Sequence, residues 1–247
     1  MSGNFFDNVS KVYESWNYDS PRVLYSLARA LKPQHILDCG TYRGLSAAWL
    51  AKACQENNFG TVHALDNWSL LEHAQILNGQ TPKEHCINNL EILGVREWVK
   101  FHDGDSHDSA VWPEQVDFAY IDAWHSFEAC YNDAEKALER GATLVAFDDT
   151  ENCVGPRLFV DHDDTLFNRN DWHQLDLHSD NGLTIFVKRK PRRLITFSQE
   201  LPLPNPGVDL RPLSIAQQKE HFAEAAKITG LDYSRIAGQT EHDMTLA

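Results

Sequence analysis

The sequence lacks the long apolar runs of membrane proteins and is poor in basic residues. No stretch approaches the roughly 18 consecutive apolar residues that indicate a membrane-spanning helix. The first residues, 1–7, contain neither the basic n-region nor the apolar h-region of a signal peptide. The 22 lysines and arginines are outnumbered by 36 aspartates and glutamates, for a net charge of −14. We therefore expect a cytoplasmic protein with no membrane partner.

Nucleic-acid binding and structural disulfides are disfavoured for related reasons. Proteins that bind nucleic acid neutralise phosphates with a basic stripe, and the only dense basic cluster here is residues 188–193. The five cysteines are odd in number and have no Cys-x-x-Cys spacing, which is typical of reduced thiols in a cytosolic chain. We expect no nucleic-acid partner and a small-molecule ligand instead.

Five short apolar runs that each end in an aspartate dominate the sequence. Runs of this length between helical patterns are typical of buried strands in a parallel sheet. The carboxyl ends of such strands share one edge, where open α/β folds bind ligands. The aspartates are therefore predicted to meet at one crevice. The runs are His35–Asp38, Thr61–Asp66, Trp98–Asp103, Val116–Asp122 and Thr143–Asp148.

The intervening segments carry helix and turn signals. Ser20-Pro21 is a predicted helix start, residues 81–84 form a capping box, and Ser126 is a predicted cap for a helix that stops at Gly141. Residues 172–178 and 183–189 flank a turn sequence and predict a closing hairpin. The fold expected is α/β and Rossmann-like. It is a doubly wound, mostly parallel seven-stranded sheet with one antiparallel strand and helices on both faces.

This fold is assigned to residues 1–190, and residues 191–247 are predicted to be a C-terminal arm and helix. The apolar side of that helix includes Ile215, Phe222 and Ile228. It either packs on its own domain or forms a homo-oligomer contact. Residues 150–170 interrupt the alternation of strands and helices, and we predict that they form a lid over the site.

The turn after the first strand carries two glycines, Gly40 and Gly44, at a strand-to-helix junction. Missing side chains there let the backbone approach a ligand at an open helix N-terminus. Tyr42 breaks the Gly-x-Gly-x-x-Gly dinucleotide pattern, so a nicotinamide site is disfavoured. Asp66, at the end of the second strand, is placed to accept ribose hydroxyls. A plain structural turn remains an alternative for the glycines.

Residues 36–46, Ile-Leu-Asp-Cys-Gly-Thr-Tyr-Arg-Gly-Leu-Ser, resemble motif I of class I S-adenosylmethionine-dependent methyltransferases. The chain looks closest to the macrocin- and mycinamicin-type sugar O-methyltransferases, and catechol O-methyltransferase is a more distant relative. The resemblance implies S-adenosylmethionine as cofactor, with Asp38 and Gly40 beside its methionine portion. The full set of implied cofactor residues is Asp38, Gly40, Thr41, Tyr42, Gly44, Ser46, Asp66, Asn67, Trp68, Asp105, Ser106 and Asp122.

The late aspartates and a histidine predict the chemistry. Asp122 and His125 follow the fourth strand, and Asp148 and Asp149 end the fifth. Carboxylates on adjacent strands need a compensating cation, and oxygen ligands suit Mg²⁺. We predict a divalent metal held by Asp122, Asp148 and Asp149. His125 is the predicted catalytic base, because its usual pKa suits proton removal from a metal-bound hydroxyl.

The predicted function is metal-assisted methyl transfer to a hydroxyl of a small molecule such as a sugar or phenol. Three alternatives stay open. The same fold can methylate without a metal, through His125 alone. It can bind the cofactor without catalysis, or it can be a nicotinamide-dependent oxidoreductase. Strand-end aspartates also tie down loops, and His125 can merely cap the next helix.

Overall fold

The computed structural model describes residues 5–13, 19–69, 79–163, 165–178 and 181–189. Contacts divide the chain into residues 1–192 and 193–247. The second unit lies outside the described residues, so the predicted arm and helix of residues 191–247 stay a prediction. Among the described residues, no helix combines the length and the apolar character needed to cross a bilayer.

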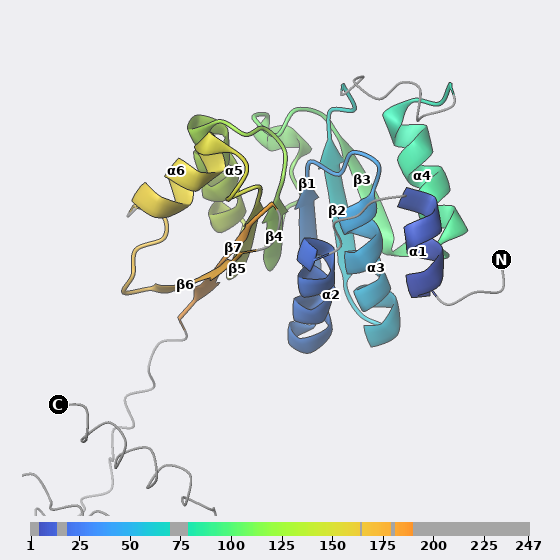
Figure 1. Ribbon diagram of the computed structural model, residues 1–247, viewed down its shortest axis with the longest axis horizontal. Coiled ribbons are helices and arrows are strands. Elements are labelled where there is room, and N and C mark those ends of the chain that lie inside the picture. Colours follow the sequence, from blue (N-terminus) through green and yellow to red (C-terminus); the bar gives the residue numbers. More distant parts are fainter. Residues whose placement is uncertain (1–4, 14–18, 70–78, 164, 179–180, 190–247) are drawn as a thin grey trace, which may run out of the picture. The chain divides into compact units, whose positions relative to one another are not determined.

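Seven strands form one sheet in the order β3-β2-β1-β4-β5-β7-β6. Strands β1 to β5 are parallel, and β7 is antiparallel to both of its neighbours. The predicted sheet, with its single reversed strand, is confirmed (Figure 1). The strands are β1 (His35–Cys39), β2 (Thr61–Asp66), β3 (Val99–Asp103), β4 (Phe118–Ile121), β5 (Leu144–Asp148), β6 (Trp172–Leu177) and β7 (Leu183–Lys188).

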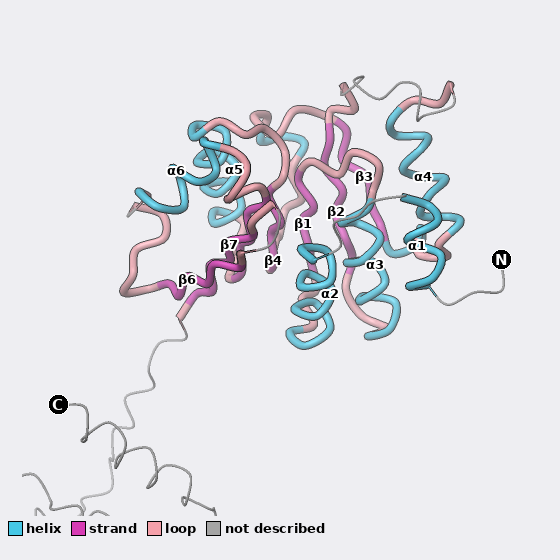
Figure 2. The backbone as a smooth tube through the Cα atoms, in the orientation of Figure 1, coloured by secondary structure: helices cyan, strands magenta, loops and turns pink. Residues whose placement is uncertain are grey.

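Helices cover both faces of this sheet, as Figure 2 shows. Helices α1 to α4 pack with one buried cluster, and α5 and α6 pack with the other. The helices are α1 (Phe5–Tyr13), α2 (Asp19–Leu31), α3 (Leu45–Asn57), α4 (Pro82–Ile92), α5 (Phe127–Glu139) and α6 (Val154–His162). Two short 3₁₀ helices, η1 (Arg96–Trp98) and η2 (Ser109–Val111), precede β3 and follow it.

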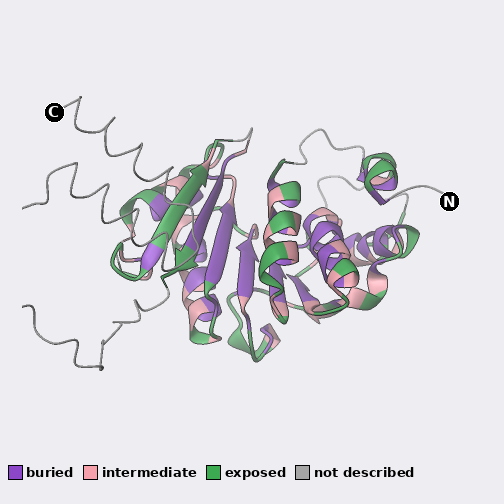
Figure 3. Cartoon of the chain, turned by 90° about the horizontal axis from the view of Figure 1, so that it is seen from below, coloured by how far each residue is buried: buried purple, intermediate pink, exposed green. Residues whose placement is uncertain are grey.

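Strand alternation divides the core between the two faces. Phe118 and Tyr120 of β4 belong to the cluster under α1 to α4, whereas Ala119 and Ile121 belong to the cluster under α5 and α6. Successive strand residues point to opposite faces, so a central strand buried on both sides is apolar throughout. Figure 3 shows this burial along the central strands, while the edge strand β6 is largely exposed.

The winding direction of the sheet reverses between β1 and β4. The crossovers through α3 and α4 build the sheet outward to β2 and β3 on one face, and α5 leads from β4 to β5 on the other. Ligands of open α/β folds bind beyond the carboxyl ends of the strands at such a reversal. The loops after β1 and β4 are therefore the parts of the fold that a ligand meets first.

Several local predictions are confirmed and one is wrong. The capping box at Thr81 and Glu84 is present, and the Ser126 hydroxyl accepts the Ala129 N–H. Ser20 does not cap α2, because that helix already begins at Asp19. Its hydroxyl donates instead to Asp148 Oδ1 at 3.0 Å, where a carboxylate offers a charged acceptor.

The predicted lid segment is largely a packed layer. Phe159 of α6 and Phe167 are buried: Phe159 packs at a tilt against Phe147, and Phe167 stacks on Phe186. Burying a phenylalanine side chain contributes about 1.5–3 kcal/mol, so these residues anchor the segment on the sheet. The part of the segment that includes α6 therefore packs into the core of the domain, and the predicted lid is wrong for this part.

Candidate functional site

Two adjoining cavities lie beyond the ends of β1, β2 and β4. The first, of about 270 Å³, is bordered by the β1–α3 loop, α2 and the ends of β4 and β5. The second, of about 340 Å³, lies against the ends of β2 and β3. Gly40, Tyr42 and Asp122 border both. An elongated ligand can therefore extend from one cavity into the other past Asp122.

The loop after β1 packs directly against the end of β4. Gly40 has φ +90°, and a Cβ built on it would lie 2.1 Å from the Asp122 carbonyl oxygen. The Gly40 N–H donates to the Leu65 carbonyl, and the Asp122 N–H donates to the Cys39 carbonyl. Only glycine permits this approach and this conformation together. The glycine predicted for close approach thus brings two loops together at the sheet reversal.

Asp66 holds the β1–α3 loop from the neighbouring strand. Its carboxylate accepts the Tyr42 N–H at 2.7 Å and the Trp68 N–H at 2.6 Å. Burial raises the pKa of Asp66, and these two donors oppose the rise. Each carboxylate oxygen retains a second lone pair, and Asp66 lines the second cavity. Asp66 can therefore stabilise the loop and accept ligand hydroxyls at the same time.

Asp38 is buried beneath this loop and does not line either cavity. Neither of its carboxylate oxygens has a hydrogen-bond partner at normal geometry among the described residues. Burial raises the pKa of Asp38 to about 6, although the nearby Ser46 and Thr41 hydroxyls favour the charged form. An unsatisfied buried carboxylate is costly, and a cationic amine in the adjoining cavity is the kind of partner that would reduce this cost.

The other predicted cofactor residues divide between the cavities. Thr41 and Ser46 line the first cavity, and Asn67, Asp105 and Ser106 line the second. Gly44 is the N-cap of α3, with φ +86°, and lines neither cavity, but its carbonyl accepts a hydrogen bond from the buried Tyr13 hydroxyl at 2.7 Å.

Trp68 also lies apart from both cavities. Its indole donates to Asp103 Oδ1 at 2.9 Å and packs against the Phe101 ring. Trp124, which lines the second cavity, is the tryptophan placed to meet a ligand.

His125 stands behind Asp122 rather than in a cavity wall. Its Nε2 lies 3.4 Å from Asp122 Oδ1 and 3.4 Å from Asp149 Oδ2. The hydrogen bond to Asp122 raises the pKa of His125 above its usual value, and burial opposes that shift. Burial raises the pKa of Asp122 to about 8, and the Asp148 and Asp149 charges add to the rise. The Asp122–His125 pair is thus an acid–base unit beside the point where the cavities meet.

The predicted metal ligands do not gather as one set. The Asp148 carboxylate turns toward α2 and accepts Ser20, whereas Asp149 Oδ2 faces His125 and Cys153 of the opposite layer. Consecutive residues at a strand end point to opposite faces, and Asp149 adopts a left-handed conformation with φ 56°. Within the described residues, the metal-type cluster is His125, Asp149 and Cys153. Asp122, Asp148 and Asp149 do not form such a cluster in this arrangement of their side chains, so the predicted Mg²⁺ site stays a prediction.

Sequence reasoning missed several residues around the site. Tyr13, Ser20, Tyr120 and Asn181 line the first cavity, and the Tyr120 hydroxyl donates to Asp122 Oδ2 at 3.3 Å. The recurrence of Phe5, Val9 and Tyr13 at helical spacing was the available signal for α1. Cys153 carried no comparable signal, because His125, which completes its cluster with Asp149, lies elsewhere in the sequence.

Comparisons with known proteins agree with this architecture. Residues 37–150 match the family model described as a methyltransferase domain. No curated protein shows a significant sequence match.

Solved structures with the same fold include three methyltransferases of low sequence identity. The O-methyltransferase from Bacillus cereus, in complex with SAH, is 19% identical over 76% of this chain and 92% of its own, at a TM-score of 0.56. The O-methyltransferase TomG from Streptomyces achromogenes, in complex with SAM, is 17% identical over 77% of this chain and 92% of its own, at a TM-score of 0.55. The methyltransferase PaMTH1 from Podospora anserina, bound to SAH, is 14% identical over 77% of this chain and 89% of its own, at a TM-score of 0.55.

The fold is therefore that of class I S-adenosylmethionine-dependent O-methyltransferases. The matched domain spans β1 to the end of β5 and contains both cavities' central residues, from Gly40 to Asp148. These findings do not distinguish the macrocin-type group from the catechol-type group.

Proposed function

We propose that this chain transfers a methyl group from S-adenosylmethionine to a hydroxyl group of a small molecule. The observation that carries the proposal is the position of Asp122, which borders both cavities and lies 3.4 Å from His125. A cofactor in one cavity and an acceptor in the other would meet at this carboxylate.

The cofactor assignment is supported by the chemistry of the cavity walls. Asp66 offers lone pairs to ribose hydroxyls, and the buried Asp38 offers a negative charge to an amine. Asp105 and Ser106 border the second cavity, where an adenine would lie. The acidic residues that line the cavities also favour binding of the sulfonium cation of S-adenosylmethionine over binding of its neutral product.

Methyl transfer is a displacement at carbon in which the acceptor oxygen, the methyl group and the sulfur must align. Holding these atoms in line supplies much of the rate, and removing the hydroxyl proton supplies the rest. Because His125 lines neither cavity, the proton reaches it through Asp122, which borders both. The resulting imidazolium is stabilised by the carboxylates of Asp122 and Asp149 at 3.4 Å. Because Asp122, Asp148 and Asp149 do not form one ligand cluster among the described residues, we propose the metal-independent alternative over the metal-assisted one.

The test uses the full chain, labelled S-adenosylmethionine and a panel of sugar and phenolic acceptors. We expect labelled product and S-adenosylhomocysteine, turnover that persists in EDTA, and a loss of about 10²–10⁴-fold in kcat for His125→Ala with cofactor binding retained. Loss of turnover in EDTA would instead favour the metal-assisted mechanism. Tight cofactor binding without product from any acceptor would favour a non-catalytic binding protein.

A further inference from the structure

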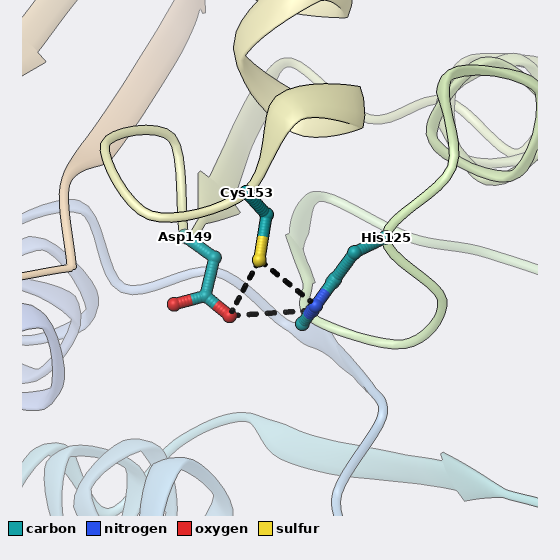
Figure 4. Close-up of side chains that lie close together, drawn as sticks. All are labelled: His125, Asp149 and Cys153. Carbon is teal, nitrogen blue, oxygen red and sulfur yellow. Dashed lines mark hydrogen bonds and ion pairs between the residues drawn. The ribbon is translucent and has the colours of Figure 1, made fainter.

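Three metal-binding side chains meet beyond the end of β5, outside both cavities. Cys153 Sγ lies 3.4 Å from His125 Nδ1 and 3.8 Å from Asp149 Oδ2, and His125 Nε2 lies 3.4 Å from Asp149 Oδ2 (Figure 4). One ligand atom from each residue lies within 4.8 Å of the other two. Asp149 and Cys153 come from the turn between β5 and α6, and His125 comes from the β4–α5 loop, so tertiary packing brings the imidazole to the other two side chains.

Backbone packing holds the cluster together. The Cys153 N–H donates to the Asp149 carbonyl at 2.9 Å, which fixes the two side chains on one tight turn. A Cβ on Gly155 would lie 2.4 Å from the His125 carbonyl oxygen, so the start of α6 rests directly on the His125 backbone. The Phe127 and Phe159 rings then join α5 to α6 at 5.7 Å. A metal ion would therefore find its ligands already assembled.

Cys153 differs from the other cysteines of the chain. The other four are buried, whereas Cys153 is only partly buried. It occupies the N-cap position of α6, yet within the described residues its side chain makes no capping hydrogen bond. Its sulfur is directed at the imidazole and the carboxylate instead (Figure 4). The thiol is therefore oriented toward two other metal-ligand side chains and does not stabilise the start of α6.

The donor set has the chemistry of a zinc site. Thiolate, imidazole and carboxylate together suit Zn²⁺, whereas Mg²⁺ takes oxygen ligands. From the usual Zn–N, Zn–O and Zn–S bond lengths, ligand atoms of a tetrahedral site lie about 3.3–3.7 Å apart. The sulfur lies nearest Nδ1 and the carboxylate nearest Nε2, whereas one ion takes one nitrogen, and with one ligand atom from each residue the separations stay within 4.8 Å. Side-chain rotations that shorten these separations would complete the site and leave a fourth position for water.

We propose that His125, Asp149 and Cys153 bind a zinc-like divalent ion, and that this ion inhibits methyl transfer. The inhibitory part rests on the proposed function, since it follows from the role of His125 as base. When the ion binds, the Cys153 thiol loses its proton to solvent and a metal–sulfur bond forms. A lone pair of the imidazole is then held by the ion and no longer accepts the acceptor's proton. The bound ion thereby acts as a switch on the base.

Metal binding is tested first, without reference to activity. The reduced, EDTA-treated full chain is titrated with Co²⁺, a spectroscopic substitute for Zn²⁺. We expect one equivalent to give a thiolate-to-cobalt charge-transfer band, which Zn²⁺ abolishes and Mg²⁺ does not. The band should be absent in Cys153→Ala and in Asp149→Asn, and present in the control His162→Ala, which changes an exposed histidine of α6. Absence of the band in the native chain, or its persistence in Cys153→Ala, would overturn the site.

Inhibition is tested separately with Cys153→Ala, because Cys153 has no part in the proposed methyl transfer. The variant should keep the native turnover in EDTA. Its half-inhibitory Zn²⁺ concentration should rise at least about 100-fold, because even a group that only hydrogen-bonds a metal ligand is worth about 10–100-fold in affinity. Unchanged zinc inhibition in the variant would contradict the switch. If the chain shows no methyl transfer at all, the cobalt titration still decides the site, so the two proposals fail separately.

Discussion

The Tyr42 N–H donates to Asp66 Oδ2 across 2.7 Å, which joins the loop after β1 to the end of β2. The same carboxylate accepts the Trp68 N–H and borders the second cavity. One side chain therefore shapes the cofactor loop and faces the ligand. This double role makes Asp66 the most informative position for testing cofactor binding.

Replacing Asp66 with alanine should weaken cofactor binding by about 10–100-fold, since hydrogen bonds to a charged group are worth about 1.5–3 kcal/mol. Calorimetric titration with S-adenosylhomocysteine measures the effect. Asp108→Ala is the control, because Asp108 caps the 3₁₀ helix η2 and lines neither cavity. Equal affinities for the two variants would contradict the assignment of Asp66.

The pH dependence of turnover should report the Asp122–His125 pair. The hydrogen bond to Asp122 raises the pKa of His125 above 6.5, and a base works only when it is neutral. Activity should therefore rise with pH through an inflection above 6.5 and be lost as the pH falls. Asp122→Asn removes the carboxylate that raises the pKa of His125. The inflection in the pH profile of kcat/KM should therefore move to lower pH, while kcat falls. An inflection that stays in place would contradict the pairing.

Gly40→Ala should be far more damaging than an alanine at another left-handed glycine. A Cβ at Gly40 would meet the Asp122 carbonyl at 2.1 Å, whereas one at Gly94, with φ +68°, meets nothing within 4 Å. Gly94→Ala should cost about 1–2 kcal/mol from backbone strain alone, and Gly40→Ala about 4 kcal/mol or more. Urea unfolding monitored by circular dichroism compares the two. Similar losses in both would show that the close approach at Asp122 is unimportant.

A row of three histidines should make stability depend on pH. His63 Nε2 lies 3.3 Å from His35 Nδ1, and His63 Nδ1 lies 2.9 Å from His102 Nε2. Burial lowers the pKa of His63 from 6.5 to about 4, and the charges of His102, His35 and Lys100 add to the fall. A folded-state pKa below the unfolded value means that the unfolded chain binds the proton first. This contribution to stability is therefore present above pH 6.5 and is lost as the pH falls toward 4.

The measurement is the melting temperature of the native chain and of His63→Asn between pH 7 and pH 4. Asp38 and Asp122, whose pKa values are raised, oppose the histidine effect because they gain protons more readily when folded. Subtracting the melting temperature of His63→Asn from that of the native chain at each pH removes the contribution of these two aspartates, because both proteins contain them. We expect the melting temperature of His63→Asn to fall less steeply with decreasing pH than that of the native chain. The melting temperature of the control His162→Asn should fall as steeply as that of the native chain. Parallel curves for native protein and His63→Asn would contradict the assignment.

The sequence was sufficient for features that depend on near neighbours along the chain. Strand β2 ends at Asp66 as predicted, because an apolar run followed by a polar residue marks the edge of a buried sheet. The capping box at Thr81 and the left-handed Gly141 follow from hydrogen bonds within one turn of chain. The closing hairpin is likewise set by two alternating runs and the turn between them.

The composition of the site could not be derived in the same way. Asp148 and Asp149 are adjacent in sequence, yet one accepts a hydrogen bond from α2 and the other faces α6. A side chain's direction at a strand end depends on the local φ and on the layers that pack against it, and neither is encoded in residue type. The metal prediction assumed that adjacent strands direct their terminal carboxylates at one point, and in this structure Asp148 and Asp149 face different layers, so the metal site stays a prediction.

By itself, then, the sequence determined the order of strands and helices, the convergence of acidic residues at one sheet edge and the glycine turn after β1. Only the tertiary structure decided which acidic groups face one another, that α1 supports Gly44 through Tyr13, and that Cys153 joins His125 and Asp149. The physical reason is the distance along the sequence over which each kind of interaction acts. Hydrogen bonding and apolar periodicity act over a few residues, whereas the contacts between layers join positions such as Ser20 and Asp148 that are far apart along the chain.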